Sequence, residues 1–320
     1  MVRVGSSKRA RSLRSLSAAF GEAFVRLSFA LVIALLVIAT FMGKMAEAAQ
    51  MLKLAMPDGP RLAILLQARR AGPNPTIIVL HSATISAQRL ARSSGFAEAA
   101  AERGFTTVFP EGKQQLWNDA RSDDPAHADD AGFLNALAHQ LIDAKIADPT
   151  RLYLTGIANG GMMAFTMICR QDALFAGVAT IIAALPAHLE QSCQPPKPLA
   201  VVMMNGTADP VTPFHGGKVG FFGRHGKVLG VERTAQIFAK AEGCTGKTQM
   251  PLPKRNKGES THVNLVTWSG CAPRASVRLY EVEGGGHQIP GGPTFLPFLF
   301  GSPNHDISAA NEILRLFSGS

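Results

Sequence analysis

Short apolar runs alternate with helix-like segments along most of this chain, and this alternation predicts its fold. The run Thr76 to Leu80 has no polar positions inside it, which is typical of a strand buried on both faces of a parallel sheet. Comparable runs predict strands over residues 61–67, 76–80, 105–109, 151–155, 177–182, 199–204, 264–268 and 277–282. Apolar residues three and four apart predict helices over 93–103, 129–145, 160–169, 231–241 and 307–317. The alternation predicts a single α/β domain over residues 49–320, with a mostly parallel, doubly wound sheet flanked by helices.

The first 48 residues follow a different pattern. No charged residue occurs from Leu27 to Gly43, basic residues precede this stretch, and Ala46-Glu47-Ala48 follows it. A basic region, an apolar region and a small-x-small site, in that order, indicate a secretory signal peptide. The uncharged stretch approaches the ~20 residues that span a bilayer, so an uncleaved N-terminal anchor is the alternative. In both cases the folded part is expected to be secreted or periplasmic, and only a retained N-terminal segment would contact a membrane.

The charge and the cysteines of the chain bear on its possible partners, disulfides and metal sites. The formal net charge is +9, but residues 1–50 hold seven basic and two acidic residues, which leaves +4 for the remainder. That small surplus does not indicate a nucleic-acid partner. Four cysteines in an exported chain favour disulfides, and of the three possible pairings we expect Cys169–Cys193 and Cys244–Cys271, because each closes a short loop. Their spacing is not that of a metal site, and we expect neither a metal nor a cofactor.

The stretch Gly156-Ile157-Ala158-Asn159-Gly160 has the pattern of a nucleophile elbow that lacks its nucleophile. It follows the apolar strand 151–155 and precedes the helix 160–169. In the Gly-x-Ser-x-Gly elbow, a serine is held on a sharp turn between a strand and a helix. Here Ala158 occupies the central position, and the chain contains no other Gly-x-Ser-x-Gly sequence.

Two further residues stand where a serine-hydrolase triad would have its other members. Acyl transfer of this kind uses a nucleophile, a histidine that takes its proton, and a carboxylate that orients the histidine. Position 158, Asp209 and His287 occur in the order typical of α/β hydrolases, each just after a predicted strand. Each one alone also fits an ordinary turn residue. Their order favours a common site, with an oxyanion hole made by backbone N–H groups of Asn159 and of Ser82-Ala83.

Several short segments carry a resemblance to a known family. They are Val79-Leu80-His81, Phe109-Pro110-Glu111-Gly112, Trp117-Asn118-Asp119, Asp129 to Leu134, Leu154 to Ala164, Asn205 to Pro213, and Glu283 to Gly292. In this combination the chain resembles the secreted polyhydroxybutyrate depolymerase and feruloyl esterase-like family of α/β hydrolases. The resemblance implies an α/β-hydrolase fold, with Asp209 and His287 as triad members. It also implies His81 and Trp117 as substrate contacts, and an ester of a hydroxy acid or an aromatic acid as substrate.

The chain departs from the family pattern at three places. Ala158 stands where the family has its serine, and Ser82-Ala83 follows His81 where the family has His-Gly. Gln288-Ile289 follows His287 where an aromatic residue is common, so a stacking wall for the substrate is expected to be missing.

Two hypotheses follow from these patterns. The first is an exported carboxylic-ester hydrolase of the polyhydroxybutyrate depolymerase-like type, whose partner is a small ester or a hydroxyalkanoate oligomer. Its Ser-Asp-His framework has Ala158 at the nucleophile position. The alternative is a catalytically inactive pseudo-hydrolase that binds a ligand outside the cytoplasm. Acyl transfer to an acceptor other than water would need the same missing nucleophile.

Overall fold

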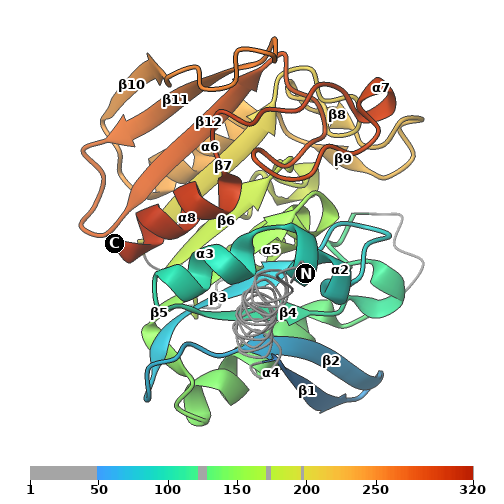
Figure 1. Cartoon of the computed structure of the whole chain (residues 1–320), viewed down its shortest axis with the longest axis vertical. Coiled ribbons are helices and arrows are strands. Elements are labelled where there is room, and N and C mark those ends of the chain that lie inside the picture. Colours follow the sequence, from blue (N-terminus) through green and yellow to red (C-terminus); the bar gives the residue numbers. More distant parts are fainter. Residues whose placement is uncertain (1–48, 122–127, 171–173, 196–197, 320) are drawn as a thin grey trace, which may run out of the picture. The chain divides into compact units, whose positions relative to one another are not determined.

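The computed structural model describes residues 49–121, 128–170, 174–195 and 198–319 (Figure 1). The chain from Gln50 onward forms one compact unit. The predicted signal peptide or anchor, residues 1–48, lies outside the described residues. Within the described ranges, no helix has the length and apolar character needed to cross a bilayer.

In the part of the chain that the structure describes, ten strands form one sheet in the order β1-β2-β4-β3-β5-β6-β7-β12-β11-β10. Strands β8 and β9 form a separate two-stranded ribbon. The strands are β1 (Ala49–Met56), β2 (Gly59–Leu66), β3 (Asn74–Leu80), β4 (Thr106–Pro110), β5 (Ala147–Ile157), β6 (Gly177–Ile181), β7 (Ala200–Gly206), β8 (Gly217–Lys218), β9 (Lys227–Val228), β10 (Gly246–Pro251), β11 (His262–Ser269) and β12 (Ser276–Glu283).

The centre of the sheet is parallel, from β4 through β3, β5, β6 and β7 to β12. Strand β2 pairs with β4 in the antiparallel orientation. Beyond β12, β11 pairs with β12 and β10 pairs with β11, both antiparallel. The order of the strands reverses between β3 and β5, because the chain runs outward to β4 before it returns to the other side of β3. In open parallel sheets, sites form beyond the carboxyl ends of the strands at such a reversal.

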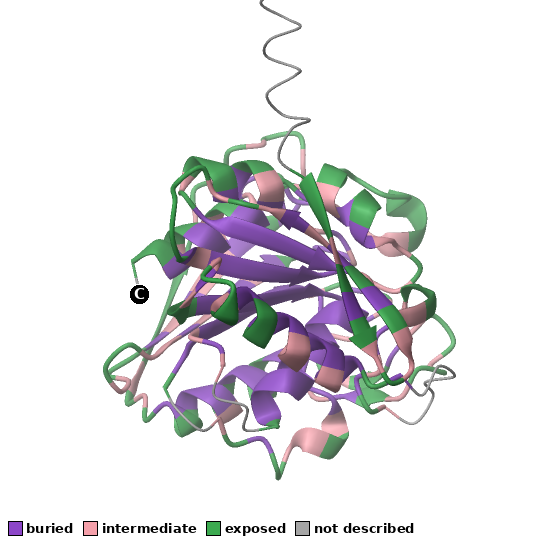
Figure 2. Ribbon diagram, turned by 90° about the horizontal axis from the view of Figure 1, so that it is seen from below, coloured by how far each residue is buried: buried purple, intermediate pink, exposed green. Residues whose placement is uncertain are grey.

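Helices cover both faces of the sheet (Figure 1). They are α2 (Ala87–Ser93), α3 (Phe96–Glu102), α4 (Asp130–Asp143), α5 (Asn159–Cys169), α6 (Val231–Ala241), α7 (Pro297–Phe300) and α8 (Ala309–Ser318), with the short 3₁₀ helices η1 (Lys113–Gln115) and η2 (Ala187–Leu189). Helices α2, α3 and α8 share one apolar core with the sheet, and α4, α5 and α6 share the other. Figure 2 shows buried residues concentrated in the strands between these two layers. The predicted doubly wound α/β architecture is therefore confirmed.

Several elements differ from the sequence prediction. The helix predicted over 93–103 is α3, which starts only at Phe96 because Gly95 before it adopts a left-handed conformation (φ 73°). Helix α2, which ends at Ser93, was not predicted. Strands β1, β8, β9 and β10 and helix α7 were not predicted either. Nearly all residues of β10 are exposed, since it is an edge strand, and such a strand has no alternation of buried and exposed positions to detect.

Both predicted disulfides are present. Cys169–Cys193 joins the end of α5 to the loop after η2, and Cys244–Cys271 joins the end of α6 to the segment after β11. Each therefore fastens a helix that packs against the sheet to a neighbouring loop.

Candidate active site

The turn between β5 and α5 has the backbone of a nucleophile elbow. Ala158 lies between the end of β5 and the start of α5 with φ 50° and ψ −115°, and its side chain is buried. A residue with a β-carbon held at such angles costs of order 1–3 kcal/mol, which the surrounding structure must offset. The Ala158 N–H donates to the carbonyl of Ile181 at the end of β6 (2.9 Å), which holds the turn against the sheet. The strained position predicted for a nucleophile is thus occupied by alanine.

The two elbow glycines are required by close backbone approach. A β-carbon on Gly156 would lie 2.1 Å from the carbonyl oxygen of Gly160. A β-carbon on Gly160 would lie 2.4 Å from the carbonyl oxygen of His81, at the end of β3. Helix α5 therefore starts in direct contact with the segment that follows β3, which is why the pattern needs glycine on both sides of Ala158.

Asp209 and His287 form a hydrogen-bonded pair. His287 Nδ1 donates to Asp209 Oδ2 at 2.8 Å, and both side chains are largely buried, with exposed fractions of 11% and 1%. The other carboxylate oxygen of Asp209 accepts the N–H groups of Val211 (2.7 Å) and Thr212 (2.8 Å). This arrangement directs the carboxylate at Nδ1, so Nε2 is the ring nitrogen that faces away from Asp209.

The three positions lie at one edge of the sheet. Ala158 follows β5, Asp209 follows β7 and His287 follows β12, and these strands belong to the parallel centre. Their carboxyl ends therefore point the same way. The structure gives Asp209 and His287 the mutual geometry of a triad acid and base, and places an elbow at the same edge.

The segments predicted to form an oxyanion hole also lie close to the elbow. Ser82 and Ala83 follow β3, the strand next to β5, and both are partly exposed. Asn159 is the first residue of α5, and the first N–H groups of a helix have no partner inside the helix. These backbone N–H groups do not depend on the side chain at position 158, so the lack of a hydroxyl group on Ala158 leaves them in place.

His81 and Trp117 lie beneath this edge rather than on it, and both are buried. His81 Nδ1 donates to Ser82 O (2.9 Å), and Nε2 accepts the N–H of Gly112 (2.8 Å). Burial lowers the pKa of His81 to about 4, which agrees with a neutral ring. Trp117 Nε1 donates to the His81 carbonyl at 3.0 Å. Because protein atoms occupy these polar groups, the structure does not support the prediction that the two rings contact substrate. They brace the end of β3.

The side chain of Asn159 fastens the loop after β4 to the elbow, which sequence reasoning missed. Its Oδ1 accepts the Trp117 N–H (2.8 Å), and its Nδ2 donates to Trp117 O (2.9 Å) and Asp119 Oδ2 (2.8 Å). Asp119 in turn accepts Nε and NH2 of Arg121 at 2.7 Å each. The Trp117-Asn118-Asp119 motif indicated a functional site in the sequence. In the structure, its contacts with Asn159 position the elbow.

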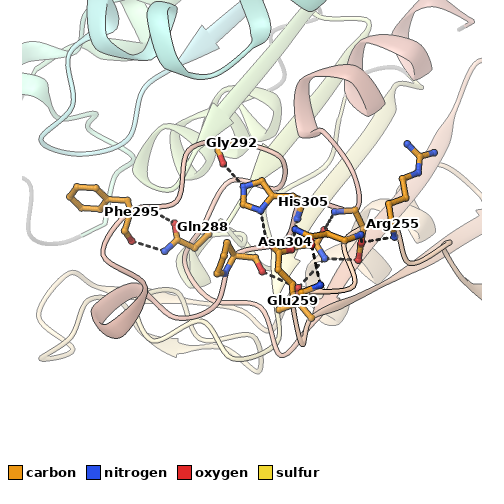
Figure 3. Close-up of polar contacts among 12 residues, drawn as sticks. Arg255, Glu259, Gln288, Gly292, Phe295, Asn304 and His305 are labelled. Carbon is orange, nitrogen blue, oxygen red and sulfur yellow. Dashed lines mark hydrogen bonds and ion pairs between the residues drawn. The ribbon is translucent and has the colours of Figure 1, made fainter.

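The loop after His287 is held by a dense set of polar contacts (Figure 3). Gln288 Nε2 donates to the carbonyls of Phe295 (2.6 Å) and Gly301 (3.2 Å), and its Oε1 accepts the Phe295 N–H (3.0 Å). His305 Nε2 donates to Gly292 O (2.9 Å), and its Nδ1 bonds Glu259. These contacts fold the loop back on itself.

The folded loop places an aromatic ring beside His287. Phe300 O accepts the His287 N–H at 2.6 Å, and the two rings stack with centroids 6.2 Å apart. Phe221 and Phe295 lie against Phe300, with ring centroids 5.4 and 5.3 Å away. An aromatic ring therefore lies beside His287, although it comes from position 300 and not from the residues directly after His287. Gln288 does not stack, but it anchors the loop that brings Phe300 to the site.

The strand order, the elbow after β5 and the hydrogen-bonded Asp209–His287 pair together define an α/β-hydrolase fold. No family model matches the chain. The solved acetyl xylan esterase from Aspergillus awamori superposes with a TM-score of 0.56 and 12% identity, over 85% of this chain and 100% of that one.

The similar curated proteins are esterases by name. "Putative esterase NocK" of Nocardia uniformis is 28% identical over 262 residues, which cover 77% of this chain and 74% of NocK. Feruloyl esterase B of Piromyces equi is 27% identical over 67% of this chain, but the match spans 39% of that longer protein. Feruloyl esterase C of Emericella nidulans is 26% identical, and the match spans 59% of it.

Proposed function

We propose that this protein is an exported carboxylic-ester hydrolase of the polyhydroxybutyrate depolymerase-like type, acting on hydroxyalkanoate or related esters. The observation that carries the proposal is the hydrogen bond of His287 to Asp209 at the sheet edge that also holds the elbow at Ala158. The esterase names of its relatives agree with this chemistry.

An apolar surface beside His287 supports an ester with an alkyl or aromatic acyl part. Phe300 stacks on the His287 ring, and the adjoining Phe221 and Phe295 are 45% and 50% exposed. Phe298 in α7 is 86% exposed. Exposed apolar groups gathered in one place mark a binding surface, and here they adjoin the proposed base.

The missing hydroxyl at Ala158 decides the mechanism. Without it, no acyl-enzyme forms at this position. His287 Nε2 takes a proton from water, the water oxygen bonds to the ester carbonyl carbon, and the backbone N–H groups near Asn159 stabilise the resulting oxyanion. The bond to the alkoxy oxygen then breaks, and that oxygen receives the proton from His287. In a triad protease, loss of the serine costs ~10⁶ in turnover, although some rate above that of water remains.

The test compares the protein with its Ala158→Ser form on short-chain aryl esters and on hydroxybutyrate oligomers. We expect slow hydrolysis by the protein as it is. For Ala158→Ser we expect kcat to rise by a factor of at least about 10³, because the serine hydroxyl can form an acyl-enzyme. Adding His287→Ala is expected to abolish both activities. The absence of turnover both in the protein and in its Ala158→Ser form would contradict the proposal.

The alternative is a pseudo-hydrolase that binds an ester or oligomer outside the cytoplasm. It rests on Ala158 alone, and the esterase names of the relatives do not favour it. This candidate predicts tight binding of hydroxybutyrate oligomers without any turnover in either form. Calorimetric titration alongside the turnover assay separates it from the first.

Export is part of the proposal and rests on the uncharged stretch Leu27 to Gly43, the Ala46-Glu47-Ala48 site and the two disulfides. We expect mature protein recovered from outside the cytoplasm to begin at Ala49. N-terminal sequencing checks this, and an intact Met1 on the exported protein would indicate a retained anchor instead.

A further inference from the structure

A cleft of about 540 Å³ is lined by basic side chains. Its walls come from the loop that carries Arg121, from η2 with His188, and from the β8–β9 ribbon with Lys218 and Lys227. Among the described residues, no carboxylate lines it.

The cleft is connected to the elbow by side-chain contacts. Arg121 in the cleft wall donates to both carboxylate oxygens of Asp119, and Asp119 accepts from Asn159 Nδ2 at 2.8 Å. Asn159 directly follows Ala158. The segment between β8 and β9 also carries Phe221, whose ring lies against Phe300 beside His287. The ribbon that lines the cleft therefore also adjoins the proposed base.

Lys218 and Lys227 concentrate positive charge at the cleft. They are directly opposite each other in the antiparallel β8–β9 pair, and both are exposed. Like charges opposite each other in a ribbon are destabilising. The sequence from Pro210 to Val231 contains no aspartate or glutamate to offset them.

Two described carboxylates near the cleft pair with arginines. Asp119 is held by Arg121, and Glu190, which follows η2, accepts Arg233 Nε at 2.9 Å. Within the described residues, neither lysine has an acidic partner. An anion that enters the cleft therefore meets two lysine ammonium groups that no described carboxylate neutralises.

We propose that this cleft binds a free carboxylate on the ester substrate, so that the substrate class is esters of acidic oligomers. A linear hydroxyalkanoate oligomer has such a carboxylate at one end. The inference rests on the proposed function, because it assigns a carboxylate-recognition site to the substrate of that hydrolase. Lys218 and Lys227 supply the charge, and Arg121, fixed by Asp119, forms the adjoining wall.

The test measures binding to the protein as it exists, whose Ala158 keeps turnover slow. Isothermal titration compares a hydroxybutyrate trimer with its methyl ester, which differs in having no negative charge. We expect the free acid to bind about tenfold more tightly, equivalent to about 1.4 kcal/mol. We expect this preference to shrink as salt is raised, because exposed charges are screened.

A double variant, Lys218→Gln with Lys227→Gln, assigns the preference to the cleft. It is expected to weaken binding of the free acid to the level of the methyl ester and to leave binding of the methyl ester unchanged. Lys240→Gln is the matched control, because Lys240 is an exposed lysine in the last turn of α6. Equal binding of the two compounds, no binding of either, or an equal effect of Lys240→Gln would each overturn the inference.

A failure of the proposed function is distinguishable from a failure of this inference. Uncharged aryl esters do not need the cleft, so their hydrolysis by Ala158→Ser reports on Asp209 and His287 alone. If those esters are hydrolysed while the acid and methyl ester trimers bind alike, the function stands and the carboxylate site is refuted.

Discussion

Replacing Asn159 with alanine is expected to unfasten the elbow from the loop after β4. The side chain is mostly buried and makes three hydrogen bonds, two with the backbone of Trp117 and one with the carboxylate of Asp119. Alanine removes all three while leaving the helix start and the backbone N–H of position 159 in place. The Trp117 N–H and carbonyl then lose their partner inside the protein.

The cost follows from the number of groups left without a partner. A buried polar group that loses its partner costs about 1–3 kcal/mol, and a hydrogen bond to a charged group is worth about 1.5–3 kcal/mol. Asp119 retains Arg121, so its loss is partial. Two backbone groups and one weakened carboxylate contact together give a loss of about 3–5 kcal/mol in the free energy of unfolding.

Urea denaturation followed by tryptophan fluorescence measures the loss, and Trp117 itself reports on the loop. Gln140→Ala is the control, because Gln140 is exposed in α4, and surface changes of this kind stay within about 0.5 kcal/mol. In the Ala158→Ser background, Asn159→Ala is also expected to lower kcat, since the oxyanion donors move with the elbow. A loss of less than about 1 kcal/mol in the free energy of unfolding would refute the idea that Asn159 fastens the loop after β4 to the elbow.

Three further outcomes are expected. Burial raises the pKa of Glu242 to about 7, above its ordinary value of 4.5, so its ionisation destabilises the folded protein as pH rises through this range. By calorimetry, Glu242→Gln should raise Tm relative to the parent at pH 8, and should raise it less at pH 5. An equal gain in Tm at both pH values would contradict this. The hydrogen bond to Glu259 raises the pKa of His305 above 6.5. The stability that protonated His305 adds to the fold is therefore complete below pH 6.5 and is lost as pH rises through the raised pKa. His305→Gln should accordingly lower Tm more at pH 6 than at pH 9. Asp130→Ala removes the nearer of the two carboxylates that pair with the buried Arg61 and leaves only Asp58, at 3.7 Å. It should cost about 3–5 kcal/mol in urea denaturation, and adding Arg61→Met should recover part of this. A double variant no more stable than the single one would count against it.

Local residue patterns were sufficient to predict the layered fold and the order of the site positions. Buried parallel strands need continuous apolar runs, and these runs are visible locally, as in Thr76 to Leu80. Ala158, Asp209 and His287 were found because each directly follows such a run, and parallel strands bring their ends to one edge. Edge strands such as β10 escaped notice because their exposed residues carry no periodic signal.

The tertiary structure alone decided how the site is built around those positions. The bond between Asn159 and Asp119 spans 40 residues of sequence, and the His287–Phe300 stack depends on how Gln288 folds an irregular loop. His81 and Trp117 matched a family motif, yet burial removed them from the surface. Side-chain contacts of this kind depend on loop paths that have no periodic pattern. Residue order therefore locates the nucleophile position, whereas tertiary packing determines the aromatic rings beside His287, the Asn159 contacts and the basic cleft.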